Sequence, residues 1–121
     1  MFLCYNRRNA MKEFDDIRPS QLAGSWYPAN PKELADSVDS YIAEAQISEI
    51  SGEIAALISP HAGHIYSGPV AGYAFKTIQN KLTDHVVILS PFHQIHSGAI
   101  LSTEHYAYQT PLGAVPVDQD N

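Results

Sequence analysis

The chain has 121 residues, of which 45% are hydrophobic and 17% are charged, a composition typical of one globular domain. Thirteen acidic residues outnumber seven basic ones, the net charge is -6, and four of the basic residues fall in the first eighteen positions. Because binding to a phosphate backbone needs a clustered basic surface, this distribution argues against a nucleic-acid partner.

No apolar run approaches the length of about 20 residues that spans a bilayer, so we expect no membrane association. The single cysteine, Cys4, allows no disulfide within the chain and fits a reducing compartment, which predicts a cytoplasmic protein. The polar stretch that begins at Met11 reads as a natural start. We therefore expect residues 1–17 to be a disordered N-terminal extension and residues 18–121 to form the folded part.

The first predicted element is an amphipathic helix over residues 31–46. Asn30 is a suitable N-cap, Pro31 suits the first helical position, and Glu33 lies three residues after the cap as in a capping box. Apolar residues recur at spacings of three and four and predict one buried stripe, formed by Leu34, Val38, Tyr41, Ile42 and Ala45.

Two continuous apolar runs follow, "EIAALIS" at 53–59 and "HVVILS" at 85–90, and each is typical of a strand buried on both faces. Between them, Pro69 is expected to open a second helix that ends near residues 80–81, with Val70, Ala74 and Ile78 on one face. Strand, helix and strand in this order predict a βαβ unit with parallel strands.

The last part of the sequence contains a candidate strand, "GAILST" at 98–103, and a proline-punctuated segment, "YQTPLGAVPVD", that suits a turn and a short edge piece. The expected fold class is α/β, with a central, largely parallel sheet flanked by helices. Three short strands make a thin sheet for strands this apolar, so the domain is expected to be incomplete.

Both apolar runs close on Ser-Pro followed by a histidine, "ISPH" ending at His61 and "LSPFH" ending at His93. The carboxyl ends of parallel strands surround the ligand crevice of an open α/β sheet, and neighbouring strands lie about 4.8 Å apart. Two neutral imidazoles at that edge would suit iron, copper or zinc.

Each histidine alone could equally be a half-buried side chain bonded to a carbonyl. A catalytic metal takes about three protein ligands. The third has no diagnostic spacing here, and the candidates are His64, His96, Glu104, His105 and Asp118.

Four segments in order, "LAGSWYPANPKEL", "ISPHAGHIYSGPVAGYAF", "ILSPFHQIHSGAILS" and "TPLGAVPVD", resemble successive motifs of the Memo family, also called AmmeMemoRadiSam system protein B. The resemblance runs from about Arg18 to Asp118. It implies a fold related to class III extradiol dioxygenases, which are non-haem iron enzymes. It also implies redox activity, as in some members, or binding of phosphopeptides or partners, as in others.

The resemblance implies that His61 and His93 are metal ligands and that Trp26 and Tyr66 line the same pocket. It implies iron as the cofactor, with copper as the alternative. The family's third ligand, usually a cysteine, comes from a C-terminal half that this sequence does not match, so the ligand set is incomplete and residues 18–121 correspond to an N-terminal half.

Two departures from the family pattern alter the expected pocket. His64 stands where the family has an aromatic residue. Phe92 and Gln94 flank His93 where the family has a serine and a second histidine.

These observations leave three competing hypotheses about function. The first is a metal-dependent, dioxygenase-like oxidoreductase in which His64 is the catalytic base. The second is a non-enzymatic module that captures a peptide or protein partner between Trp26 and Tyr66. The third is a truncated, inactive fragment.

Overall fold

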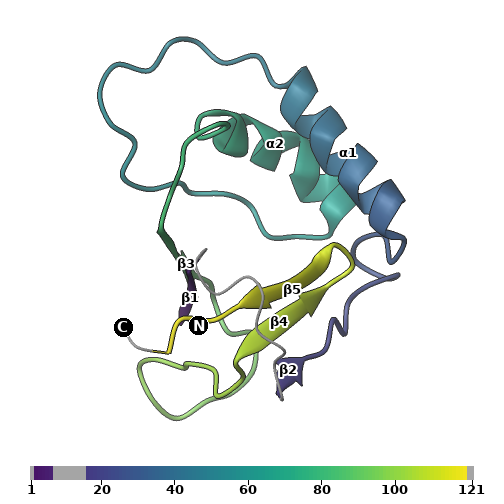
Figure 1. The fold of residues 1–121 in the computed structure, drawn as a ribbon, viewed down its shortest axis with the longest axis vertical. Helices are drawn as coiled ribbons and strands as arrows, with labels where there is room; N and C mark the ends of the chain where they lie inside the picture. The colour runs from purple at the N-terminus through teal and green to yellow at the C-terminus, as the bar shows by residue number, and fades with distance from the viewer. Residues whose placement is uncertain (1, 7–15, 120–121) are drawn as a thin grey trace. The chain divides into compact units, whose positions relative to one another are not determined.

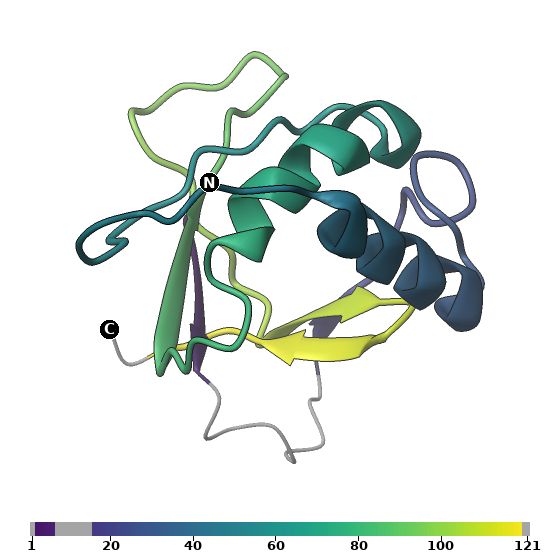
Figure 2. The same cartoon turned by 90° about the horizontal axis from the view of Figure 1, so that it is seen from above.

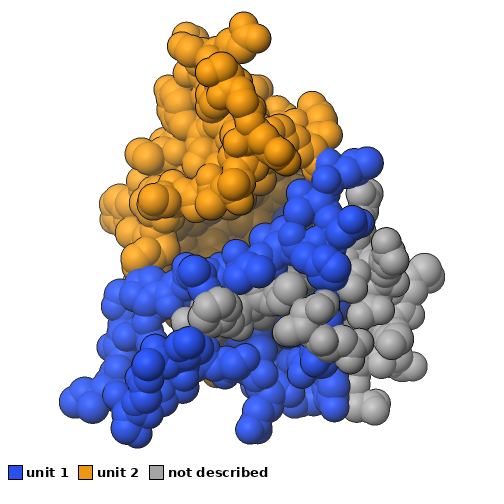
Figure 3. All heavy atoms as spheres, turned by 90° about the vertical axis from the view of Figure 1, so that its left-hand side faces the viewer, with its two compact units in different colours: residues 1–20, 82–121 blue, residues 21–81 orange. Residues whose placement is uncertain are grey.

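The computed structural model describes residues 2–6 and 16–119, which fall into two compact units (Figure 3). Unit 1 comprises residues 1–20 and 82–121, and unit 2 comprises residues 21–81. Most of the expected extension 1–17 lies outside the described residues, namely positions 1 and 7–15, whereas Phe2–Asn6 is the strand β1.

Unit 2 contains the helix α1, Pro31–Glu44, which confirms the first predicted helix (Figure 1). The Asn30 side chain accepts hydrogen bonds from the backbone N–H groups of Lys32 and Glu33, at 2.9 and 3.1 Å. The predicted stripe is the inner face of the helix, since Leu34 is buried and Val38, Tyr41 and Ile42 are half-buried. The N-cap and the apolar stripe in the sequence therefore correctly predicted where α1 begins and which of its faces is packed.

The second helix, α2, spans His64–Lys76 and begins five residues before the predicted start at Pro69. Gly63 is its N-cap, and the His64 N–H donates to the Trp26 carbonyl at 2.8 Å. Pro69 lies inside the helix, where its fixed φ is tolerated although it cannot donate to the carbonyl four residues earlier. The predicted start was wrong because the Trp26 carbonyl accepts from the N–H of the first helical residue. Trp26 is distant in the sequence, so the local pattern around Pro69 does not indicate this hydrogen bond.

The packed face of α2 also differs from the prediction. Ser67, Gly68 and Gly72 are buried, whereas Val70, expected to share one apolar face with Ala74 and Ile78, is 61% exposed. The two helices lie side by side in both ribbon views (Figures 1 and 2). They approach closely, because a Cβ added at Gly68 would lie 2.2 Å from the Tyr41 ring.

Unit 1 contains two small sheets. In one, β1 pairs antiparallel with β3, His85–Leu89. In the other, β4, Ala107–Thr110, lies between β2, Ile17–Arg18, which runs parallel to it, and β5, Gly113–Pro116, which runs antiparallel. The expected turn and edge piece are thus a β4–β5 hairpin, closed by the Thr110 hydroxyl, which donates to the Gly113 carbonyl at 2.8 Å.

The α/β class is confirmed, with two helices, one antiparallel two-stranded sheet and one mixed three-stranded sheet. Of the predicted strands, the one near 85–90 is confirmed, whereas residues 53–59 and 98–103 form none. β3 pairs with β1 rather than with 53–59, so the expected parallel βαβ unit is absent from the described residues. An apolar run becomes a strand only where a second strand offers matching N–H and C=O groups, and residues 53–59 have no such neighbour among the described residues.

The buried apolar residues that the structure describes are few and lie in both units. Leu34 and Ala45 belong to unit 2, and Ala107 and Val117 belong to unit 1. All five residues of β3 are exposed, contrary to the expected burial on both faces. Neither helix in the described part of the chain combines the length and the apolar character that a bilayer crossing requires.

Candidate functional site

The segment that joins His61 to α2 carries most of the predicted site residues. His61 is exposed and lies in an irregular loop three residues before the helix. Gly63, the N-cap of α2, has φ -51° and ψ 146° and provides no side chain to cap the helix. The sequence placed His64 and Tyr66 in a loop, but the structure places both in the first turn of α2.

His64 is held by three contacts within unit 2. Its backbone N–H donates to Trp26, its Nε2 lies 2.8 Å from the Ser37 hydroxyl of α1, and its ring centroid lies 5.2 Å from that of Tyr41. The ring is half-buried. The imidazole predicted as a catalytic base therefore has a defined position at the α1–α2 junction.

Gly63 lies close to the Tyr66 ring and to the backbone carbonyl of Trp26, the two residues predicted to line the pocket. A Cβ added at Gly63 would lie 3.5 Å from the Tyr66 ring and 3.8 Å from the Trp26 carbonyl. Both aromatic side chains remain largely accessible, with 50% of Trp26 and 76% of Tyr66 exposed. Trp26, His64 and Tyr66, three of the five residues predicted for the site, thus belong to unit 2, where the backbone carbonyl of Trp26 accepts from the His64 N–H.

His93, the second predicted metal ligand, lies in unit 1, in the loop that follows β3, and is exposed. His61 and His93 belong to different units, so their convergence on one metal ion stays a prediction. Both side chains lie outside the buried core of their units.

The described residues contain no group of three His, Cys, Asp or Glu side chains placed to hold a metal ion. Two of the candidate third ligands contact another polar side chain. The His105 Nδ1 lies 2.8 Å from Asp16, and the Asp118 carboxylate, almost fully buried, lies 3.2 Å from the His85 Nε2. The donor types suit a metal, but the described residues supply no complete set.

A pocket of about 370 Å³ lies in the loop around His93, and the sequence did not predict it. Phe92 and His96 meet edge to face there, with ring centroids 5.9 Å apart. Gly98, at φ 133°, brings the backbone so close that an added Cβ would lie 3.1 Å from the His96 Nε2. Gly98 was the one feature of the sequence that could have indicated the tight turn beside this pocket. The pocket is lined by Ser90, Pro91, Phe92, Gln94, His96, Gly98, Ala99, Ile100 and Leu101.

Ser37 is a further residue that sequence reasoning missed. It reads as a polar residue of an amphipathic helix, and its partner His64 lies 27 positions further along the chain. No local pattern signals a contact over that separation.

Comparison with known proteins supports the resemblance found in the motifs. The model of the Memo-like protein family matches residues 18–121. A MEMO1 family protein of Nitrosopumilus maritimus is 38% identical over 109 residues, which is 86% of this chain and 39% of the relative.

Two eukaryotic relatives are similar over nearly the same span. Protein MEMO1 of Danio rerio is 34% identical over 84% of this chain and 34% of its own length. The MEMO1 family protein MHO1 of Saccharomyces cerevisiae is 33% identical over 86% of this chain and 31% of its own length. The chain spans about a third of the length of the curated relatives it matches.

Proposed function

Because this chain belongs to the Memo-like protein family, we propose that it contributes His61 and His93 to a metal site that supports redox chemistry of the non-haem iron, extradiol-dioxygenase type. The observation that carries the proposal is that both histidines stand exposed in loops with the same Ser-Pro context, outside the buried core. Iron is the proposed metal and copper the alternative, since neutral imidazoles suit both.

Such a site needs roughly three ligands, of which His61 and His93 are two, and the family resemblance implies a third beyond these two histidines. A bound iron ion supplies Lewis-acid and redox chemistry at its open coordination positions. The protein's own residues then bind and orient the substrate. His64 would accept a proton from it, and Trp26 and Tyr66 would flank it as apolar walls. The single cysteine of the sequence fits a cytoplasmic setting, which is part of the proposal.

Anaerobic calorimetric titration of the full chain with ferrous iron tests the metal site. We expect His61→Ala and His93→Ala each to weaken binding by about tenfold or more, because each removes a proposed donor. His85→Gln is the matched control, since His85 is not among the candidate ligands and already contacts Asp118. Binding that is absent, or equal in all four proteins, contradicts the proposal.

A second candidate function, capture of a peptide or protein partner without turnover, is favoured by the exposed aromatic pair. Trp26 and Tyr66 offer rigid rings on one unit, and such side chains are enriched in binding surfaces. Peptides selected from a displayed library against the full chain should lose affinity for Trp26→Ala and Tyr66→Ala. They should retain affinity for Leu112→Ala, an exposed apolar residue of the β4–β5 turn. Equal loss in all three variants would reject this function.

A further inference from the structure

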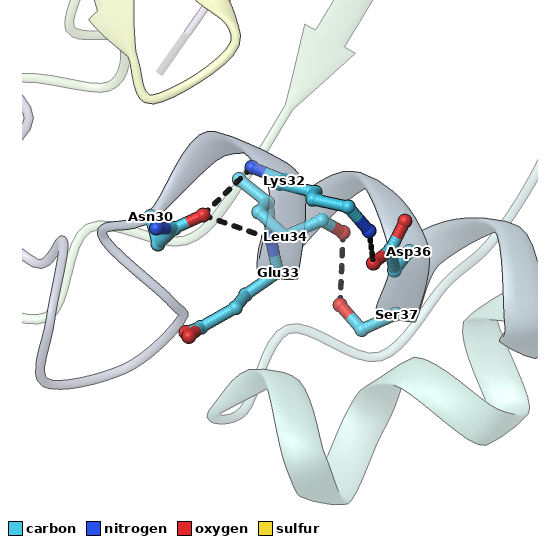
Figure 4. Close-up of polar contacts among 6 residues, drawn as sticks. All are labelled: Asn30, Lys32, Glu33, Leu34, Asp36 and Ser37. Atoms are coloured by element: carbon cyan, nitrogen blue, oxygen red, sulfur yellow. Dashed lines mark hydrogen bonds and ion pairs between the residues drawn. The ribbon is translucent and has the colours of Figure 1, made fainter.

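The contact between α1 and α2 determines which nitrogen of His64 carries its hydrogen. The Ser37 hydroxyl lies 2.8 Å from the Leu34 carbonyl, within the same helix (Figure 4), and 2.8 Å from the His64 Nε2. A carbonyl oxygen can only accept, whereas an imidazole nitrogen can accept or donate, so both contacts are hydrogen bonds only when the single hydroxyl hydrogen of Ser37 is donated to Leu34. Toward His64, Ser37 therefore presents only lone pairs.

It follows that the His64 Nε2 carries a hydrogen and donates it to Ser37. In a neutral imidazole the other nitrogen, Nδ1, then holds the lone pair. Among the described residues, no hydrogen-bond donor meets Nδ1. The His64 ring lies against the Tyr41 ring at an interplanar angle of 57°, and the His64 N–H is bonded to the Trp26 carbonyl.

We infer that Ser37 is a positioning residue that holds His64 as the Nε2–H tautomer, so that Nδ1 serves as the acceptor for a ligand bearing an O–H or N–H donor. The inference deepens the proposed function, because it names the atom through which His64 would accept a proton. It does not depend on metal binding at His61 or His93.

The test is NMR spectroscopy of the full chain with ¹⁵N-labelled histidine, at a pH where the ring is neutral. We expect His64 in the wild type to show a protonated Nε2, with a directly observed Nε2–H signal, and an unprotonated Nδ1. In Ser37→Ala the ratio of the Nε2–H to the Nδ1–H tautomer should fall by about 2- to 10-fold, as loss of one ordinary hydrogen bond predicts. The Nε2–H signal should also broaden through exchange with water.

Two variants separate positioning from mere structural support. Ser37→Thr keeps the hydroxyl and should restore the wild-type spectrum. Ser40→Ala removes a serine of the same helix that bonds Glu44 on the exposed face, and should leave His64 unchanged. A wild-type His64 with its hydrogen on Nδ1, or an unchanged tautomer ratio in Ser37→Ala, would overturn the inference. If Ser37→Ala does not fold, the wild-type and Ser37→Thr spectra still decide it. Iron titration of Ser37→Ala, where it folds, distinguishes failure of this inference from failure of the metal site.

Discussion

At the scale of single residues, short-range polar contacts organise unit 2. Asn30 accepts from two N–H groups that have no partner within α1 (Figure 4). Lys32 and Asp36 form an ion pair one turn apart, but both side chains are well exposed, so this pair contributes little to stability. The cap is therefore the polar contact of the first turn that matters most for the helix.

We expect Asn30→Ala to lower the free energy of unfolding by about 1 kcal/mol, because it leaves the N–H groups of Lys32 and Glu33 without their acceptor. Chemical denaturation followed by circular dichroism measures the change. Asn30→Ser keeps an acceptor at the same position and should stay close to the wild type. If alanine and serine destabilise the chain equally, the side-chain cap is not the cause.

At the scale of secondary-structure elements, two glycines determine how α1 meets α2. A Cβ at Gly72 would lie 2.3 Å from the Tyr41 carbonyl oxygen, and one at Gly68 would lie against the Tyr41 ring. A backbone carbonyl cannot turn aside as a ring can, so Gly72 is the stricter of the two positions. The close approach also places Ser37 and Tyr41 of α1 within reach of His64.

We expect Gly72→Ala to destabilise the chain by about 1–3 kcal/mol through overpacking. In an open helix position the same change would stabilise by about 0.5–1 kcal/mol, so the sign of the effect reports the contact. Thermal and chemical unfolding of the variant provide the measurement. Gly63→Ala is the control, because its added Cβ would make only ordinary contacts, at 3.5 Å or more. Stabilisation by Gly72→Ala would show that the helices are not in close contact there.

At the scale of the whole molecule, much apolar surface is accessible in segments for which the sequence predicts burial. Val87 and Leu89 of β3 are 58% and 67% exposed, and Ile58 in the irregular segment before His61 is 98% exposed. The β1–β3 sheet leaves one edge of β3 without a strand partner among the described residues. Exposed apolar side chains on an open strand edge favour association with apolar molecules.

We expect the full chain to bind the dye 8-anilinonaphthalene-1-sulfonate in its folded state, and the double change Val87→Lys and Leu89→Lys to reduce the dye fluorescence. The reason is that these two side chains present apolar surface to solvent. Leu112→Lys, at an exposed apolar position in the β4–β5 turn, should have a smaller effect. Fluorescence that does not respond to the β3 changes would place the apolar binding surface elsewhere in the chain.

The sequence alone was enough for features whose causes lie within a few residues of each other. The cap and the stripe predicted α1, the continuous apolar run predicted the strand at β3, and the ordered motifs predicted the family, which the comparisons confirm. The five candidate site residues also came from the sequence, and three of them, Trp26, His64 and Tyr66, belong to unit 2.

Only the tertiary structure decided which segments meet. An apolar run in the sequence does not indicate which strand it will pair with. In the structure β3 pairs with β1, and residues 53–59 are irregular. The start of α2 depends on the Trp26 carbonyl, and the tautomer of His64 depends on Ser37, 27 positions earlier in the chain. Hydrogen bonds between residues distant in the sequence form only once packing has brought their donors and acceptors within about 3 Å. The spacing of residues in the sequence does not indicate which of them come that close.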